Sequence, residues 1–474
     1  MVKNKALRID GEIITFFSLL SGFLFFSIIN NGSDEVIHLF YSVFYLGVLF
    51  FLIYISRKDL VNSFLAIGFF LYFYQVPFLF SLTDSRHAVY NIVYDQWAAR
   101  EFYLMISIVL TCFSTMFYFF TRLVNAHSYV NDMKENIRSN NNPIFYYSFI
   151  FASSILVGGI VKSGGFYPYI SLDKFEADKV ASFLFLSYKF FVLIMSVSCF
   201  SAKRLGVGKL MLILIFVIIE LLTAKRFLIM AVGVLFFLLR FKKISLWFFL
   251  GLFLSVFFAN FLKYIYYSLP NAILNNASDF WSSVFYFRAE DVLMSSFFIG
   301  EFSAHIRLSY LNIYHNLNYG IADFVNLMLS GFPFSNSLFG IHYESVGEMF
   351  RVHVGEPWAG LASSVYIMPY LSLSALGVLL VYAAFFVNFY CLLYLGRKNL
   401  IFSLVALSLL PLFTFYINRE PFLLIGKSIF LMSSSVALVW LLFRFVQPIA
   451  FSFFIKRDIP RIKCKAKRYL FRTH

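Results

Sequence analysis

The chain has 474 residues, of which 61% are hydrophobic and only 13% are charged, and its mean hydropathy is +0.79. A soluble globular chain carries roughly 25% charged residues, so this composition excludes an ordinary soluble domain. The formal net charge of +15 would suit a nucleic-acid partner, but the basic residues lie in short connectors and a tail. That distribution is typical of a membrane protein, and we expect no nucleic acid.

Apolar stretches that are nearly free of charge follow one another along the whole chain. Most can cross a hydrocarbon core of about 30 Å as a helix, in which the backbone satisfies its own hydrogen bonds. The predicted fold is therefore all-α, a polytopic membrane protein with about twelve transmembrane helices. The predicted spans are residues 12–30, 36–55, 61–82, 101–121, 144–161, 181–201, 209–224, 227–240, 244–263, 370–395, 400–417 and 422–443.

These spans divide the chain into four parts. We expect nine transmembrane helices in residues 1–263, a large loop in 264–369, three further helices in 370–443 and a basic tail in 444–474. The first residues are basic and lead into an apolar run without a small-residue cleavage site, which predicts a first helix that is retained.

Charge differs between the connectors on the two sides of the predicted bundle. Connectors on one side, both termini included, hold 25 lysines and arginines against 6 acids, and those on the other hold 12 against 17. This bias places both termini in the cytoplasm and the 264–369 loop outside. Apolar residues recur in that loop at helical spacing, which predicts amphipathic helices on the membrane face: Phe302, Ile306, Ile313, Leu317, Ile321, Phe324 and Met328.

No pattern in the chain indicates a bound metal or cofactor. The four cysteines, Cys112, Cys199, Cys391 and Cys464, are far apart and form no CxxC pair, which argues against a disulfide framework or a zinc site. The chain has no HExxH and no DxD pair. A metal-dependent transferase that uses sugar nucleotides is therefore disfavoured, and we expect no metal and no cofactor.

The first candidate site is the turn between the seventh and eighth spans, Thr223-Ala224-Lys225-Arg226. A Lys-Arg pair on the external side opposes the orientation rule, and the guanidinium fork of arginine suits a phosphate. Lys225 and Arg226 are thus candidates for a lipid-diphosphate clamp. The structural alternative is that they reach lipid head groups or pair with Glu220.

The second candidate site is the external loop itself. Its aromatic residues include Tyr310, Tyr314, Tyr319 and Trp358, which have the apolar face and polar edge that suit sugars. Any one of its ionisable residues is more often simply solvated or hydrogen-bonded than catalytic. The ionisable candidates are Arg288, Glu290, Asp291, Arg307, Arg351, His353 and Glu356.

The third candidate is a small-residue segment that leads into the tenth span. Residues 355–364 contain two glycines and a proline, and Leu376-Gly377-Val378-Leu379-Leu380 follows near the outer end of the span. An ordinary helix start explains the segment equally well when it is considered alone.

Together, these three features resemble the O-antigen polymerase and ligase superfamily. The resemblance covers the topology of the whole chain: a Thr-x-x-Arg turn at Thr223–Arg226, a large late loop, and the glycine-containing helix around Gly377. A ligase is expected to have a histidine immediately before the last segment, and here the nearest is His353. This departure favours a polymerase.

The resemblance implies a GT-C-like glycosyltransferase in the bacterial inner membrane that acts in lipopolysaccharide biosynthesis. It would join undecaprenyl-diphosphate-linked oligosaccharide repeat units at the periplasmic face, with a chain-length co-polymerase as a possible partner and lipids around it. Arg226, Arg288 and Arg307, with Lys225 and Arg351 as seconds, would stabilise the departing diphosphate without a metal. The base that activates the acceptor hydroxyl would be one of Glu290, Asp291, His353 and Glu356.

Two other functions remain open from the sequence. A flippase for lipid-linked oligosaccharides would usually show two matching halves, and we find none in this chain. A ligase, or another membrane transferase that modifies the O-antigen, would share the topology and differ in its acceptor.

Overall fold

The computed structural model describes the chain from residue 34 to residue 444, with gaps. Every regular element in this part is a helix. The predicted spans 12–30 and 244–263 and the basic tail lie outside the described residues. The described residues are 34–56, 59–73, 76, 95–166, 169, 179–223, 227–241, 301–332, 335, 338, 340, 346, 350, 352, 365–416, 426 and 428–444.

Three helices of the described part are long and apolar enough to cross a membrane. They are α4 (Gln96–Leu123), α6 (Asn141–Lys162) and α18 (Ile367–Gly396). The coarse prediction of an all-helical protein suited to a membrane is therefore confirmed. The number of twelve spans and the GT-C-like arrangement stay predictions.

Most of the remaining helices overlap predicted spans, whereas α5 (Ala126–Arg138) lies in a connector for which the sequence predicted no helix. The other helices are α2 (Asp34–Ser56), α3 (Leu60–Phe73), α8 (Lys179–Ser201), α9 (Val207–Leu222), α10 (Phe227–Arg240), α14 (Glu301–Tyr314), α15 (Ile321–Ser330), α19 (Leu400–Pro411), the π-helical η3 (Leu412–Tyr416) and a last helix, Ser428–Arg444. Residues 74–75 and 77–82 of the predicted third span lie outside the described residues.

Side-chain caps fix where several of these helices begin. Asp95 accepts a hydrogen bond from the amide of Ala98 at 2.7 Å and starts α4. Asn125 and Asn399 do the same at the starts of α5 and α19. Each cap satisfies an amide that the first helical turn leaves without a partner.

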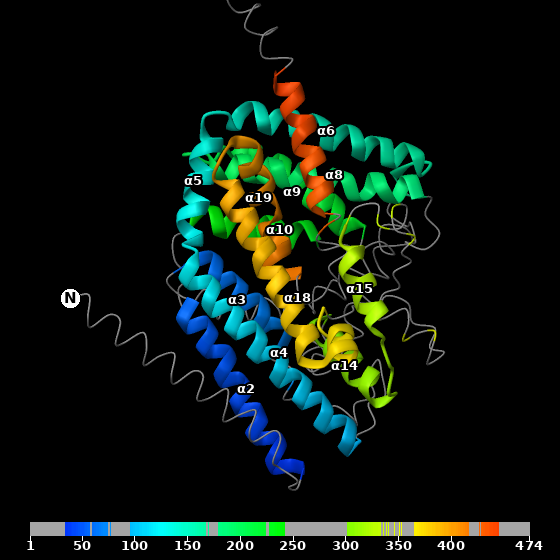
Figure 1. The fold of residues 1–474 in the computed structure, drawn as a ribbon. Coiled ribbons are helices and arrows are strands. Elements are labelled where there is room, and N and C mark those ends of the chain that lie inside the picture. Colours follow the sequence, from blue (N-terminus) through cyan, green and yellow to red (C-terminus); the bar gives the residue numbers. More distant parts are fainter. Residues whose placement is uncertain are drawn as a thin grey trace, which may run out of the picture.

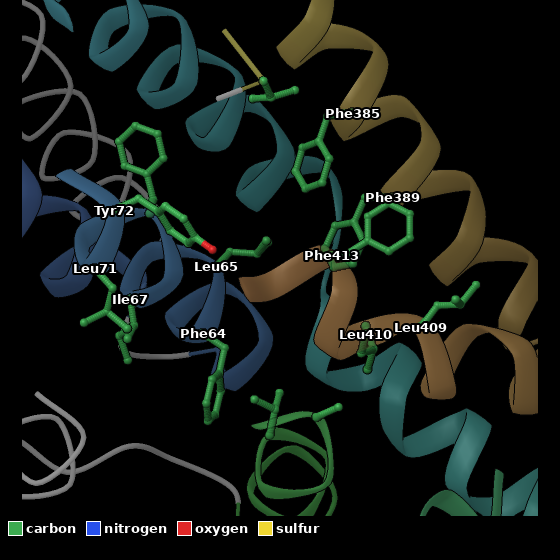
Figure 2. Packing of buried hydrophobic residues seen from close by; sticks show 14 of the residues in the cluster. Phe64, Leu65, Ile67, Leu71, Tyr72, Phe385, Phe389, Leu409, Leu410 and Phe413 are labelled. Atoms are coloured by element: carbon green, nitrogen blue, oxygen red, sulfur yellow. The ribbon is translucent and has the colours of Figure 1, made fainter. Parts of the chain in front are cut away.

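The centre of the bundle is aromatic. Phe69 of α3 stacks on Phe113 of α4 with ring centroids 3.7 Å apart. Figure 2 shows Phe385 and Phe389 of α18 beside Phe413 of η3, at centroid distances of 5.7 and 5.2 Å. Offset and tilted ring pairs of this kind stabilise a core beyond the area that they bury.

Helix α5 ties several helices together at one end of the bundle. Arg138 Nε donates to the carbonyl of Ser201, which ends α8, and Lys134 Nζ donates to the carbonyl of Leu239, near the end of α10. Asn136 Nδ2 donates to the carbonyl of Arg397, just after α18. We call this the α5 end.

The opposite end gathers α3, α4, α14 and α18. Asp95 before α4 contacts Tyr310 of α14, and Phe73 of α3 lies 5.5 Å, centroid to centroid, from Tyr366 at the start of α18. Helices α4 and α18 each run from this α14 end to the α5 end (Figure 1). The predicted topology and its orientation in a membrane stay predictions.

Candidate functional site

Helix α14 is enclosed by the bundle at the α14 end. All of its residues from His305 to Ile313 are buried, and the helix packs against α3 and α4. This differs from the amphipathic surface helix that the sequence predicted. In helix α15, Phe324 is buried, whereas Ile321, which the sequence placed on the same apolar face, is exposed.

Polar side chains lie within this enclosed helix. Ser309 Oγ donates to the carbonyl of His305 at 2.7 Å, and Asn312 Nδ2 donates to the carbonyl of Leu308 at 2.7 Å. Each of these two side chains therefore donates a hydrogen bond to a backbone carbonyl of the preceding turn of α14. His305 and Arg307 carry the ionisable chemistry of the helix.

His305 is fully buried among aromatic rings. Its imidazole lies edge-on to Tyr72 and Phe73 of α3, with centroids 4.9 and 6.0 Å away, and to Tyr366 before α18, at 6.3 Å. The sequence assigns no role to His305, because nothing in its neighbourhood along the chain distinguishes it. Its surroundings come from segments far apart in the sequence.

Arg307, one of the predicted diphosphate ligands, is 2% exposed. Burial of a guanidinium costs free energy unless the charge is paired or hydrogen-bonded. In a region of low dielectric constant, its attraction for an anion is stronger than it would be in water. The structure thus places one predicted cation inside the bundle, and phosphate binding by Arg307 stays a prediction.

Tyr310 is buried one turn further along α14. Its hydroxyl accepts a hydrogen bond of 3.0 Å from the amide of Asp95, and Phe102 lies edge-on at 5.9 Å. Burial raises the pKa of Tyr310 to about 12, and the nearby Asp95 carboxylate adds to the increase, while the hydrogen bond from the amide opposes it. This tyrosine joins α14 to the start of α4.

The other two described tyrosine candidates differ in exposure. Tyr319 is 7% exposed, its hydroxyl donates to Asn312 Oδ1 at 2.8 Å, and burial raises its pKa. Tyr314 is 37% exposed and stacks on Tyr310, with centroids 6.2 Å apart. Tyr314 is thus the one of the three described candidates that presents more than a third of its surface, and sugar binding by all three stays a prediction.

A buried ion pair supports the turn between α9 and α10. Glu220 of α9 is fully buried and pairs with Lys189 of α8, and its second carboxylate oxygen accepts from the amide of Leu228 in the first turn of α10. Lys189 also lies 5.7 Å from the ring centroid of Phe227. The carboxylate of Glu220 is therefore engaged between α8 and α10.

The sequence offered Glu220 as an alternative partner for Lys225 or Arg226. The described contacts of its carboxylate are with Lys189 and with the backbone amide of Leu228. The pairing of Lys189 with Glu220 joins two predicted spans, and no spacing rule links residues 189 and 220. The three residues 224–226 connect the supported ends of α9 and α10, so the clamp candidates Lys225 and Arg226 belong to a turn whose two ends are fixed.

The third predicted segment contains a close backbone approach. A Cβ atom on Gly377 would lie 2.1 Å from the carbonyl oxygen of Pro369, so only glycine fits there. Helix α18 kinks three residues earlier, at Ser374, whose φ of 50° and ψ of −137° are not helical. Gly377 of the predicted small-residue motif thus allows the first residues of α18, before the kink, to approach the residues after it.

Most of the predicted site residues lie outside the described residues, and their roles stay predictions. These are Lys225, Arg226, Arg288, Glu290, Asp291, Arg351, His353, Glu356 and Trp358.

The described part defines the class of the protein as a helical membrane protein with an enclosed polar helix at one end of an apolar bundle. No protein-family model, no curated protein and no solved structure matches the chain. The resemblance to O-antigen polymerases therefore stays a hypothesis that rests on the residues themselves.

Proposed function

We propose that this protein is a membrane glycosyltransferase that polymerises oligosaccharide repeat units carried on undecaprenyl diphosphate. The observation that carries the proposal is the enclosed guanidinium of Arg307, on α14, at one end of an apolar helical bundle. A lipid diphosphate has an anionic head and an apolar tail, and a cation within an apolar bundle supports the proposal because it suits both parts.

In the proposed reaction, the bond between the anomeric carbon of the growing chain and its diphosphate breaks. An acceptor hydroxyl on a fresh lipid-linked unit forms the new glycosidic bond and gives its proton to a base. The diphosphate leaves as an anion, so cations aimed at the developing charge supply the main stabilisation. Arg307 would act with Arg226 and Arg288 in that role, and Lys225 and Arg351 would assist.

The base is one of Glu290, Asp291, His353 and Glu356, and His305 is a further candidate. His305 lies on α14, the helix that carries Arg307, and is ringed by Tyr72, Phe73 and Tyr366. An imidazole held in a fixed position can accept a proton near neutral pH. The exposed ring of Tyr314 would contact a sugar of the incoming unit.

The direct test is polymerisation of lipid-linked repeat units by the purified protein, with and without a chelator. We expect products longer than one unit under both conditions. Arg307→Gln should lower the rate by about a hundredfold or more, the usual effect of losing one donor to a developing anion, and Arg307→Lys should restore part of it. Ser309→Ala is the matched control, because it removes a neutral hydroxyl from the same buried helix and leaves the charge of Arg307 in place.

Loss of the gene separates this function from that of a flippase. Cells without a polymerase should carry lipopolysaccharide capped by a single repeat unit, whereas cells without a flippase should carry none. Full-length ladders from the Arg307→Gln protein would remove Arg307 from the mechanism, and an absence of polymer with the intact protein would overturn the proposed function.

A further inference from the structure

Arg240, the last residue of α10, holds buried polar atoms that lack a partner. Its Nε and Nη2 atoms are buried, and in the described part of the chain neither makes a hydrogen bond. Buried donors of a charged group are costly to leave without an acceptor. A group that accepts two parallel hydrogen bonds would satisfy both atoms at once.

Further cations surround Arg240 at the α5 end. Arg138 of α5 is close enough for the two like charges to repel, and Lys209 and Arg240 both act electrostatically on Cys199. Lys134 Nζ donates to the carbonyl of Leu239, the residue before Arg240. We call Lys134, Arg138, Lys209 and Arg240 the basic cluster.

The described partners of Lys209 and Arg138 are mostly neutral oxygens. Lys209 Nζ contacts the neutral amide oxygen of Asn142, and Arg138 Nε donates to the carbonyl of Ser201. Glu135 pairs with Arg138 on the exposed side of α5, where its side chain is 65% exposed. Arg138, Lys209 and Arg240 lie near one another, and such a concentration of positive charge favours a bound anion.

Apolar rings stand beside the cluster. Phe236 and Phe237 of α10 lie 6.0 and 5.3 Å, centroid to centroid, from Phe241, and Phe200 of α8 lies 5.4 Å from Phe236. Phe241 is 47% exposed. A guanidinium next to exposed aromatic surface suits an anion that is attached to a hydrocarbon chain, since basic sites between helices on the cytoplasmic side bind lipid phosphates in this way.

We infer that the basic cluster binds the phosphate of an anionic phospholipid, to which Arg240 donates two parallel hydrogen bonds. The lipid phosphate would accept from the buried Nε and Nη2 atoms of Arg240 and offset the repulsion from Arg138. Its acyl chains would lie against the phenylalanines. This site is at the end of the bundle opposite α14 and does not depend on the proposed transferase activity.

Native mass spectrometry of the purified full chain tests the inference, with phosphatidylglycerol and phosphatidylcholine as probes. We expect the parent to retain phosphatidylglycerol preferentially and Arg240→Gln to weaken that retention about tenfold, the effect of losing one charge-assisted contact. Arg204→Gln is the matched control, because Arg204 is an exposed arginine at the same end. It removes the same charge and should retain the lipid as the parent does.

Equal retention by the parent and the Arg240→Gln protein would overturn the inference. Thermal unfolding midpoints distinguish the source of the phosphate: phosphatidylglycerol should raise the midpoint of the parent, and sodium phosphate at matched ionic strength should not. An equal increase with sodium phosphate would assign the site to free phosphate and overturn the lipid assignment. If Arg240→Gln does not fold, Arg240→Lys removes the fork and keeps the charge, and undiminished retention by it would also overturn the inference.

Discussion

The glycine at position 377 shows how a single residue sets the shape of α18. The carbonyl of Pro369 occupies the space that a side chain at 377 would need, with its oxygen 2.1 Å and its carbon 2.8 Å from the Cβ position. Both atoms belong to the backbone, so neither can rotate away as the end of a side chain would. The kink at Ser374 lies between the two contacting residues.

We predict that Gly377→Ala destabilises the protein by about 1–3 kcal/mol, the usual cost of an overpacked contact. The measurement is the thermal unfolding midpoint in detergent. Gly233→Ala is the control, because a Cβ atom there meets nothing within 4 Å, and replacement of a helical glycine by alanine in open space is stabilising. The two substitutions should therefore shift the midpoint in opposite directions, and a shift in the same direction would contradict the close approach.

Tyr310 predicts a pH dependence of stability at the α14 end. Its pKa in the folded protein is raised from 10 to about 12 by burial. A raised folded pKa means that the stabilisation by the neutral phenol is complete below pH 10 and is lost as the pH rises from 10 to about 12.

We therefore expect Tyr310→Phe to lower the unfolding midpoint at pH 8, because the amide of Asp95 loses its acceptor. The difference from the parent should shrink between pH 10 and 12, where the parent alone has to keep a buried phenol protonated. Tyr314→Phe removes a hydroxyl from the exposed neighbour and serves as the control. A difference that stays constant across this range would show that Tyr310 is not the titrating group.

At the residue scale, the sequence predicted the kinds of side chain in the site better than their surroundings. Arg307 was identified as a phosphate ligand from its charge and its loop, but its enclosure depends on α3 and α4, about 200 or more residues earlier. Tyr310 was expected as a sugar platform, whereas its hydroxyl binds the start of α4. A pattern along the chain does not show which distant residues will surround a side chain in the folded protein.

At the scale of helices, the Lys189–Glu220 pair couples α8 to the turn between α9 and α10. Glu220 holds Lys189 with one oxygen and the amide of Leu228 with the other. A carboxylate near the start of a helix is also favoured by the helix dipole. The pair therefore fixes the ends that the clamp candidates connect.

We predict that Lys189→Met and Glu220→Gln each destabilise the protein by about 3–5 kcal/mol, because each leaves a buried charge without its partner. The double variant should be more stable than the sum of the two losses implies, since it contains neither charge. Unfolding midpoints of the four proteins form a double-mutant cycle, and Lys203→Met, at an exposed lysine, is the control. Strictly additive losses would mean that the two side chains have no interaction energy with each other and would contradict the pairing.

The sequence predicted the bounds of most described helices within a few residues, because long apolar runs act locally. It did not predict α5, which the side chain of Asn125 caps, or that α4 begins directly after Asp95. It did not predict that α14 is enclosed, because the same helical spacing of apolar residues suits a surface helix and a helix packed on several sides. The choice between them is made by the helices that surround α14.

At the scale of the whole molecule, α4 and α18 link two ends of different chemistry. The α14 end holds His305 and Arg307 in an enclosed helix, whereas the α5 end carries the basic cluster and the exposed connectors around Arg204 and Lys398. A helix of 28 residues such as α4 is about 42 Å long, which exceeds the hydrocarbon core of a bilayer. The two ends would therefore lie on opposite sides of a membrane.

Cysteine labelling in intact cells tests this arrangement. We expect Asn318→Cys, an exposed position just after α14, to react with a membrane-impermeant maleimide. Arg204→Cys and Lys398→Cys should react only after the inner membrane is permeabilised, because the positive-inside rule places the α5 end in the cytoplasm. The background is a chain in which each native cysteine is replaced by alanine: Cys112, Cys199, Cys391 and Cys464.

The labelling results bear directly on the chemistry, because lipid-linked repeat units can meet Arg307 only if the α14 end faces the compartment that contains them. Labelling of all three positions after permeabilisation reports that each protein is made and that each thiol is accessible. Reaction of Arg204→Cys in intact cells would reverse the predicted orientation, and protection of Asn318→Cys there would place the α14 end in the cytoplasm. Either result would mean that Arg307 cannot meet a periplasmic substrate. It would contradict the proposed polymerase, but it would not contradict the helical bundle.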